Sequence, residues 1–321
     1  MAPQHQRSTD DPDADLVDLL GGTASSDSTH PAPSRSRRPV VYVLLASVAA
    51  LVVLVLGIAG PFTSTPRPPV VTEAGQATVE SSSALNAAAS TVMPAQPVDA
   101  ADLGALTEAT TFTTVSGAPR DPAPAADPSG GVVHPTVKVA AYASPGGPAV
   151  AAIPVKQLGT SDTWLPVVGE QPGWIQVLLP ARPNNSTAWL AMTDALTLAR
   201  TPYQIKVDRA AFRLTLMRDG QQVAQWTVGI GKPSAITPPG RTFILASIKD
   251  QQQSWSPVVL PLGAHSDTHL TYGGGPGTVA VHTWPTDVYG QASSDGCIRV
   301  PPDALNLLST EVPLGTPVLI R

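Results

Sequence analysis

One feature limits what this chain can fold into more than any other: a run of 21 residues without a charged side chain, Val40 to Gly60. As a helix the run would be about 30 Å long, which matches the hydrocarbon core of a bilayer. Arg35, Arg37 and Arg38 precede it, and positive charges beside a spanning segment favour the cytoplasmic side. The sequence therefore predicts one transmembrane helix over 40–60. The protein is expected at the cell membrane as a single-pass type II protein, with its C-terminal part outside the cytoplasm.

The same run has a second interpretation, a signal peptide that is cleaved. Ile58, Ala59 and Gly60 end it in small residues of the kind that a signal peptidase accepts. The long polar leader and the full-length apolar run nevertheless fit an uncleaved anchor better than the short apolar region of a signal peptide. A lipoprotein is excluded, because no cysteine directly follows the run.

Composition divides the rest of the chain. Residues 1–39 are polar and rich in aspartate, which predicts a disordered cytoplasmic tail. From 61 to 132, Pro, Ala, Ser and Thr dominate and leave too little apolar bulk for a core, which predicts a linker. Short alternating apolar runs then predict a mainly β fold in two units, 133–200 and 201–321. The net charge of -5 offers no basic surface for nucleic acid, and we set nucleic acid aside as a partner.

The first unit is expected to hold strands separated by turn residues such as Pro, Gly and Asn: Val137 to Tyr142, Thr163 to Val168, Trp174 to Leu179 and Thr187 to Met192. The order of these runs, with Tyr142 before a Ser-Pro turn and Trp174 after Pro-Gly, resembles the bacterial SH3-like domains that accompany cell-wall enzymes. This resemblance implies a small β-barrel. Trp174 and Trp189 are assigned to packing, and the unit is given no site of its own.

The second unit begins with a hairpin that turns at Asp219-Gly220, a dipeptide suited to tight turns. One short helix is expected over Asp303 to Ser309. The expected strands are Tyr203 to Asp208, Phe212 to Met217, Gln222 to Val228, Thr242 to Ile248, Val258 to Leu260, Thr278 to His282 and Pro317 to Ile320.

Cys297 is the only cysteine in the sequence, so an exported chain cannot use it for an internal disulfide. It is therefore an inert buried thiol, a reactive one, or the site of an intermolecular bond. Gly296 directly before it frees the backbone for a turn that aims the thiol and nearby N–H groups into a cleft. Small and polar neighbours favour the reactive interpretation over packing.

A thiol is mostly protonated at neutral pH, so a nucleophilic cysteine needs a base beside it. His282 is the best candidate, since it ends an alternating run and the following loop returns the chain toward Cys297. His265 and His269 are rivals for this role. With Asp267 they also form a loose set of metal-ligand residue types, but their spacing matches no established ligand geometry.

A histidine that ends a strand, followed 15 residues later (297 − 282) by Cys297 in a Ser-x-Gly-Cys-apolar-Arg motif, resembles the L,D-transpeptidase catalytic domain, also called the YkuD domain. The resemblance spans essentially all of 201–321. It includes the opening hairpin, the segment Thr237 to Phe243 and the closing segment Pro313 to Ile320.

The resemblance implies that Cys297 is the nucleophile and that His282 acts as general base and then as acid. It also implies that the backbone at Gly296 and Cys297 donates to an oxyanion, that Ser294 belongs to the catalytic motif, and that Arg299 supports the site or the substrate. No metal or organic cofactor is implied. The implied partner is a peptidoglycan stem peptide, which is joined to another stem in a 3-3 cross-link through a thioester acyl-enzyme, and acylation by carbapenems is expected.

The sequence departs from the family's usual pattern at two positions. Thr283 follows the histidine where Gly is usual, and Asp295 precedes the glycine where many members have His. Thr283 is expected to orient the imidazole through its hydroxyl or its backbone carbonyl. Asp295 adds a negative charge, which raises a thiol pKa unless that charge is shielded.

Several alternatives stay open at this point. Arg299 is either a substrate residue or a structural ion pair, and Tyr272 and Trp284 are either cleft walls or packing residues. A non-catalytic wall-binding protein would leave the thiol idle, and transfer to water instead of an amine would give L,D-carboxypeptidase trimming. A papain-like peptidase is disfavoured, because its nucleophile precedes its histidine in the chain.

Overall fold

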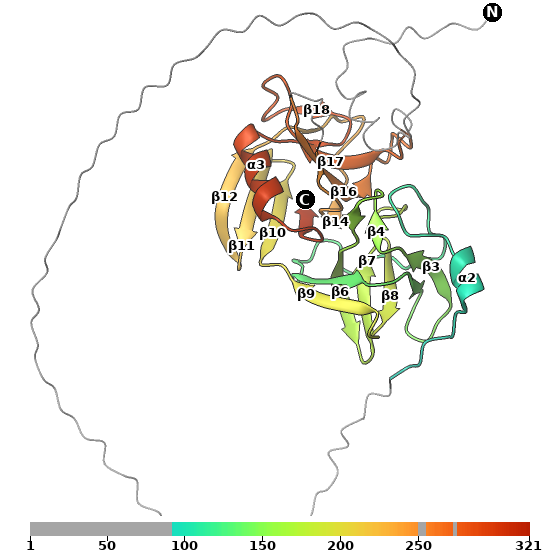
Figure 1. Ribbon diagram of the computed structural model, residues 1–321. Coiled ribbons are helices and arrows are strands. Elements are labelled where there is room, and N and C mark those ends of the chain that lie inside the picture. Colours follow the sequence, from blue (N-terminus) through green and yellow to red (C-terminus); the bar gives the residue numbers. More distant parts are fainter. Residues whose placement is uncertain (1–91, 250–254, 272–274) are drawn as a thin grey trace, which may run out of the picture. The chain divides into compact units, whose positions relative to one another are not determined.

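The computed structural model describes residues 92–321 except 250–254 and 272–274 (Figure 1). Its first region is a seven-stranded sheet with the order β3-β2-β8-β7-β6-β1-β9 and antiparallel pairings. A two-stranded pair, β4 with β5, accompanies it. The bounds are β1 Gly131–Pro135, β2 Val139–Tyr142, β3 Ala149–Ile153, β4 Lys156–Gln157, β5 Ser161–Asp162, β6 Leu165–Gln171, β7 Trp174–Leu178, β8 Thr187–Ala191 and β9 Leu196–Arg200.

The four strands expected in this region are confirmed as β2, β6, β7 and β8, with shifted ends. Strands β1, β3 and β9 were not expected. β3 is rich in alanine, which has a low strand propensity, and β9 lies at the edge of the sheet with an exposed face. The likeness to SH3-like domains stays a prediction.

The segment before this sheet differs from the expected linker over 61–132. Its described part, from residue 92, packs along the sheet and contains helix α2, Ala100–Ala105, whose first turn is capped by the Asp99 side chain. Ala109 and Val115 are buried in the core of the sheet. The backbone of Ala109 donates to Ala152 at 2.8 Å. An extended segment can gain these backbone hydrogen bonds with little apolar bulk of its own, which is why composition alone misses the packing.

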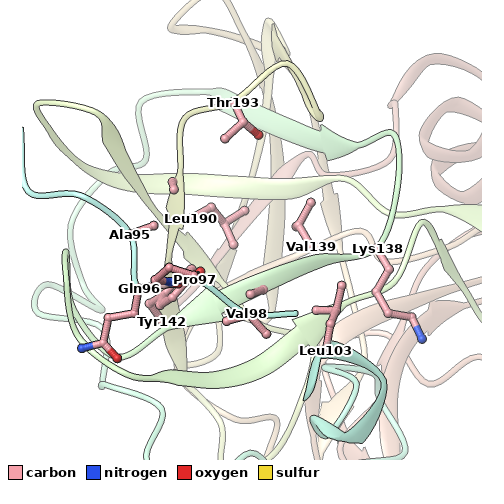
Figure 2. Close-up of a pocket in the computed structure, with 12 residues that line it drawn as sticks. Ala95, Gln96, Pro97, Val98, Leu103, Lys138, Val139, Tyr142, Leu190 and Thr193 are labelled. Carbon is pink, nitrogen blue, oxygen red and sulfur yellow. The ribbon is translucent and has the colours of Figure 1, made fainter. Parts of the chain in front are cut away.

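The start of this segment covers two aromatic side chains of the sheet. Trp174 Nε1 donates to the Met93 carbonyl at 2.7 Å, and the Tyr142 hydroxyl donates to the Gln96 carbonyl at 2.9 Å. A pocket of about 280 Å³ lies between this segment and the sheet, and residues of both line it, among them Lys138 and Leu103 (Figure 2). The two aromatics are thus packing residues, in line with the role assigned to Trp174.

The C-terminal region is built on a five-stranded sheet with the order β12-β11-β10-β20-β14 and a four-stranded sheet with the order β15-β16-β17-β19. Strands β13 and β18 form a separate parallel pair. The bounds are β10 Tyr203–Asp208, β11 Arg213–Arg218, β12 Gln221–Thr227, β13 Ile230–Gly231, β14 Gly240–Phe243, β15 Ile248–Lys249, β16 Val258–His265, β17 Thr278–His282, β18 Ala292–Ser294, β19 Ile298–Arg299, α3 Pro302–Glu311 and β20 Pro317–Ile320.

Most of the predicted elements of this region are confirmed. The opening hairpin turns at Asp219 and Gly220, which have φ angles of 50° and 76°, as a tight turn requires. The run expected over 242–248 is divided between β14 and β15, and β16 extends to His265. Helix α3 buries Ala304, Leu305 and Leu308 in the core that the two sheets share.

The described residues are mainly β, as the sequence predicts. The expected tail 1–39 and transmembrane helix 40–60 lie outside the described residues, and both stay predictions. In the part of the chain that the structure describes, no helix has the length and apolar character needed to cross a membrane.

The two regions share buried contacts. Phe243 and Leu245 of the C-terminal region belong to the same buried cluster as Leu165 and Val177 of the first sheet. Arg241 of β14 forms a buried ion pair with Asp121, in which its Nε donates to Asp121 Oδ2 at 2.7 Å. The boundary expected at residue 200 therefore separates strands but does not separate two independent cores.

Candidate active site

Strands β17 and β19 bring the predicted nucleophile and base together. They pair in parallel, with Val281 opposite Ile298 and His282 opposite Arg299. Continuing this register by one residue places Cys297 beside Ala280, and these two do pack together in one small buried cluster. Side chains alternate along a strand, so His282 and Cys297 project from the same face of the paired strands. The connection between the two strands, residues 283–297, includes the short strand β18.

His282 is fully buried, and its ring is held by a backbone contact. Nδ1 lies 2.7 Å from the Thr283 carbonyl, which can only accept, so Nδ1 carries the proton of the neutral ring. Nε2 then presents a lone pair, and it is buried with no hydrogen-bond partner among the described residues. Burial lowers the pKa of His282 to about 4, the Thr283 carbonyl opposes this shift, and the charge of Arg299 adds to it. At neutral pH the ring is therefore an unprotonated base.

Thr283 is anchored by residues that the sequence did not single out. Its hydroxyl donates to the Trp255 carbonyl, and its backbone N–H donates to Ser256 Oγ at 3.2 Å. The Trp255 ring lies 5.8 Å from the His282 ring and 5.4 Å from the Trp284 ring, and Trp255 also packs against the cluster that contains Cys297. Thr283 thus orients the imidazole through its carbonyl, while its hydroxyl ties the strand end to Trp255.

The turn from Ser294 to Cys297, named here the nucleophile turn after its predicted nucleophile, is closed by the Ser294 side chain. The Ser294 hydroxyl donates to the Cys297 carbonyl at 2.6 Å and accepts from the Gly296 N–H at 3.2 Å. Thr237 Oγ1 donates to the Gly296 carbonyl at 2.9 Å from the other side. Gly296 has φ of 120°, a backbone conformation that residues with a side chain rarely adopt. The turn is therefore specific for glycine and is fixed from two directions.

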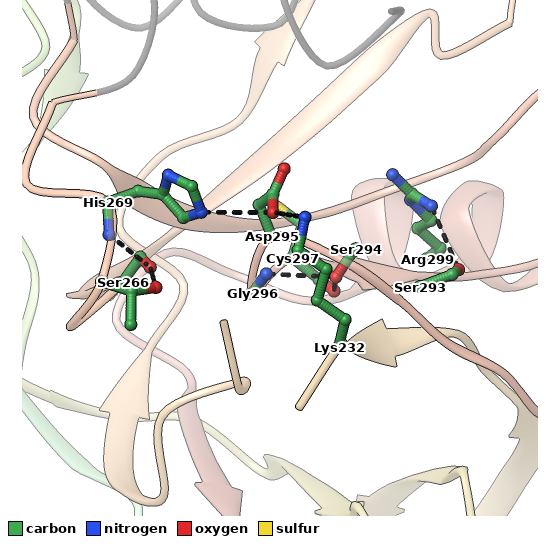
Figure 3. A network of polar contacts seen from close by, with 10 residues as sticks. Lys232, Ser266, His269, Ser293, Ser294, Asp295, Gly296, Cys297 and Arg299 are labelled. Carbon is green, nitrogen blue, oxygen red and sulfur yellow. Dashed lines mark hydrogen bonds and ion pairs between the residues drawn. The ribbon is translucent and has the colours of Figure 1, made fainter. Parts of the chain in front are cut away.

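Asp295 is the centre of a polar cluster beside the thiol (Figure 3). Its Oδ1 lies 2.5 Å from Lys232 Nζ and 3.2 Å from His269 Nε2. Lys232 comes from the end of β13, and His269 comes from the loop after β16. The negative charge that the sequence places at Asp295 is thus paired with the Lys232 ammonium group.

Arg299 and Trp284 contact each other directly. The Arg299 guanidinium lies 3.4 Å from the centre of the Trp284 ring, a cation–π contact, and its Nη1 donates to Ser293 Oγ at 3.3 Å. The Arg299 side chain is buried. This position suits a support for the His282 strand end, while a contact of either residue with substrate stays a prediction. Tyr272 lies outside the described residues.

The two rival histidines have other environments. His265 is buried, with Nε2 2.8 Å from the Thr111 carbonyl and 3.0 Å from Thr111 Oγ1. His269 reaches the nucleophile turn through Asp295. In the described ranges no group of three His, Cys, Asp or Glu side chains is arranged to hold a metal ion. Lys232, Thr237 and Trp255 were missed because their role depends on contacts between distant parts of the chain.

Residues 202–320 match the model of the family described as the L,D-transpeptidase catalytic domain, YkuD. This segment thus has the family's sequence pattern over the whole C-terminal region. No curated protein has a significant match to the chain.

Three solved structures are among those to which the chain is similar. A mutant of the Enterococcus faecium L,D-transpeptidase is 22% identical, with 37% of this chain and 50% of that chain covered and a TM-score of 0.30. An L,D-transpeptidase from Mycobacterium smegmatis is 17% identical, with 46% and 90% covered and a TM-score of 0.31. L,D-transpeptidase 3 from Mycobacterium tuberculosis, in complex with a faropenem-derived adduct, is 14% identical, with 44% and 75% covered and a TM-score of 0.31. The match thus spans only half the length of the first of these proteins.

Proposed function

We propose that residues 201–321 form the active site of a peptidoglycan L,D-transpeptidase. The observation that carries the proposal is the state of His282, a neutral ring with Nδ1 bound to the Thr283 carbonyl and Nε2 available on the face from which Cys297 projects. This is the arrangement that a cysteine nucleophile requires from its base. The match of 202–320 to the catalytic-domain model supports the substrate class.

In the first step His282 Nε2 accepts the proton of the Cys297 thiol while the sulfur attacks the donor peptide. The attacked carbonyl belongs to the L-centre of diaminopimelate and is followed by D-alanine. The tetrahedral intermediate collapses when His282 returns the proton to the D-alanine nitrogen, so the C–N bond breaks and D-alanine leaves. The product is a thioester between Cys297 and the shortened stem.

In the second step the side-chain amine of another stem attacks the thioester. His282 accepts a proton from this amine and passes it to the sulfur as the C–S bond breaks, which restores the thiol and leaves an amide. The amide is a 3-3 cross-link. Transfer to water instead would release a tripeptide stem, which is the trimming alternative. No step uses a metal or an organic cofactor.

The developing oxyanion is assigned to the backbone of the nucleophile turn. The Gly296 N–H already donates to Ser294 Oγ, so its donation to an oxyanion requires the hydroxyl to yield. Ser294 therefore has a positional role in this proposal. Arg299 and Trp284 support the strand end that carries His282, and they are proposed to line the substrate site.

We place this activity outside the cytoplasm. The uncharged run 40–60, with arginines before it, supports a single-pass type II anchor. Peptidoglycan stem peptides are then reachable from the C-terminal region. Carbapenems are proposed to acylate Cys297, because a strained β-lactam carbonyl is open to attack by the same thiol.

The test is mass spectrometry of disaccharide-tetrapeptide muropeptides incubated with the full-length chain in detergent micelles. Wild type is compared with Cys297→Ala and His282→Ala. Loss of D-alanine with formation of dimers by wild type alone is the expected result. Loss of D-alanine without dimers supports trimming. Binding of the substrate without turnover by any of the three proteins would overturn the catalytic proposal in favour of a wall-binding protein.

A further inference from the structure

The loop between β7 and β8 forms hydrogen bonds with the turn that follows β16. Asn184, between β7 and β8, binds the backbone of His265 on both sides: Nδ2 donates to the His265 carbonyl at 2.7 Å, and Oδ1 accepts from the His265 N–H at 2.9 Å. Nδ2 also lies 3.0 Å from Asp267 Oδ1. One amide side chain thus fixes the start of the 265–269 turn, defined here as the described residues His265 to His269.

Arg182 of the same loop binds two further carbonyls of the C-terminal region. Its Nη1 donates to the Ser266 carbonyl at 3.2 Å, and its Nη2 donates to the Pro276 carbonyl at 2.7 Å. The loop is itself fixed from behind, since the Arg182 N–H donates to Thr113 at 2.9 Å and the Val115 N–H donates to the Arg182 carbonyl at 2.9 Å. The backbone around Thr113 therefore fixes the position of Arg182, whose guanidinium contacts the 265–269 turn.

The turn is also anchored by its own first residue. The buried His265 ring contacts Thr111, whose hydroxyl lies within hydrogen-bond distance of Thr278 at the start of β17. Burial lowers the pKa of His265 to about 4, so this ring is neutral at pH 7. The turn thus rests on residues that precede the first sheet as well as on the loop that carries Asn184.

The other end of the turn reaches the nucleophile. Ser266 Oγ accepts from the His269 N–H at 3.1 Å, which orients His269 so that its Nε2 lies 3.2 Å from Asp295 Oδ1 (Figure 3). Asp295 is joined to Cys297 through Gly296 alone. A continuous set of contacts therefore leads from Asn184, through the 265–269 turn, to the residue two positions before the thiol.

We propose that Arg182 and Asn184 are positioning residues of the active site, which hold the 265–269 turn so that His269 and Asp295 stay in contact beside Cys297. The first sheet then contributes residues that position the active site. Consequences for turnover rest on the proposed function, whereas consequences for the reactivity of the thiol do not.

The charged and titratable groups around the thiol come from several elements. Lys232 and His269 face Asp295, while His282 and Arg299 project from β17 and β19. If the 265–269 turn is released, Asp295 loses its contact with His269, and its negative charge is less well shielded. A less compensated carboxylate near a thiol disfavours the thiolate.

The experiment measures alkylation of Cys297 by iodoacetamide against pH in the full-length protein. Asn184→Leu removes both backbone contacts while keeping the side-chain size, and Gln171→Leu is the matched control on an exposed position of the same sheet. We expect Asn184→Leu to move the alkylation profile to higher pH and to slow the reaction at pH 7 about threefold to tenfold. Gln171→Leu is expected to leave the profile unchanged. His269→Gln is expected to move the profile in the same direction as Asn184→Leu, without addition in the double variant.

Each outcome decides one question. If Asn184→Leu lowers the melting temperature but leaves the alkylation profile at the wild-type position, the contact is structural only and the positioning proposal is wrong. The same conclusion holds if the two single shifts add fully in the double variant, because residues on one path do not act independently. If wild type shows the pH-dependent alkylation but never turns over muropeptides, the proposed function fails while the positioning result remains interpretable.

Discussion

The nucleophile turn and the contact between Asn184 and the 265–269 turn differ in the sequence separation of the residues that they join. In the nucleophile turn, Ser294 bonds the carbonyl of Cys297 three positions away. In the other region, Asn184 and His265 are 81 positions apart, and Arg241 and Asp121 are 120 apart. The residues proposed to do the chemistry are recognisable from short sequence motifs, whereas the contacts that hold them in place form only in the folded chain. Four predictions test how far this division holds.

The largest effect is expected from the buried ion pair between the two regions. Arg241→Met leaves the buried Asp121 carboxylate without its cation, which should cost about 3–5 kcal/mol of unfolding free energy. Urea unfolding at pH 7 measures it. Arg213→Met is the matched control, because its ion pair with Asp208 is nearly half exposed on both sides and should contribute about 0–1 kcal/mol. Equal losses in the two variants would contradict the view that the regions depend on each other.

A smaller effect is expected within the nucleophile turn. Ser294→Ala leaves the Cys297 carbonyl and the Gly296 N–H without their partner, at a cost of about 1–3 kcal/mol for buried groups. We expect kcat/KM on the muropeptide to fall roughly tenfold to a hundredfold. Ser309→Ala, at a partly exposed serine of α3, is the control. Unchanged kcat/KM in Ser294→Ala would show that the turn is held by Thr237 alone.

The next prediction concerns pH and the buried histidines. The pKa of His265 is lowered in the folded state to about 4, so the unfolded chain binds more protons between about pH 4 and 6.5. The contribution of this ring to stability is therefore present above the unfolded pKa and is lost as pH falls toward 4, by about 2 kcal/mol between pH 7 and 5. Unfolding of wild type and His265→Gln at both pH values isolates it, since the other titrating groups are common to both. A loss of stability in His265→Gln as steep as in wild type would contradict the assignment.

The smallest effect is expected at Lys232. Lys232→Gln removes a cation that is about two-fifths exposed, so water and salt already screen much of its interaction with Asp295. We expect Cys297 alkylation at pH 7 to slow by about twofold, and the difference to disappear at high salt. Lys156→Gln, in an exposed pair with Asp162, is the control. A difference that persists at high salt would mean that Lys232 acts through geometry and not through charge.

Features that depend on neighbouring residues were predicted from the sequence, and features that depend on distant residues were not. Strand β17 and the hairpin of β10 and β11 were predicted because alternation of apolar side chains is a local property. The packing of residues 92–132 against the first sheet was not predicted. This segment gains its order from backbone hydrogen bonds to the sheet, and amino-acid composition does not reveal such bonds. The contact of Thr283 with the His282 ring was anticipated in part, since the two residues are neighbours in the sequence and therefore in any fold.

The sequence by itself determined the residue types and the spacing that the proposed chemistry needs: one thiol, a histidine at a strand end, a glycine before the cysteine, and an uncharged run long enough to cross a bilayer. Only the tertiary structure decided that Lys232 pairs with Asp295, that His269 contacts the same carboxylate, that the Trp255 ring lies beside the His282 ring, and that Asn184 holds the 265–269 turn. The physical reason is that charge compensation and side-chain hydrogen bonds act over a few ångströms in space. Residues far apart in the sequence come within that distance only when the sheets pair and the cores close.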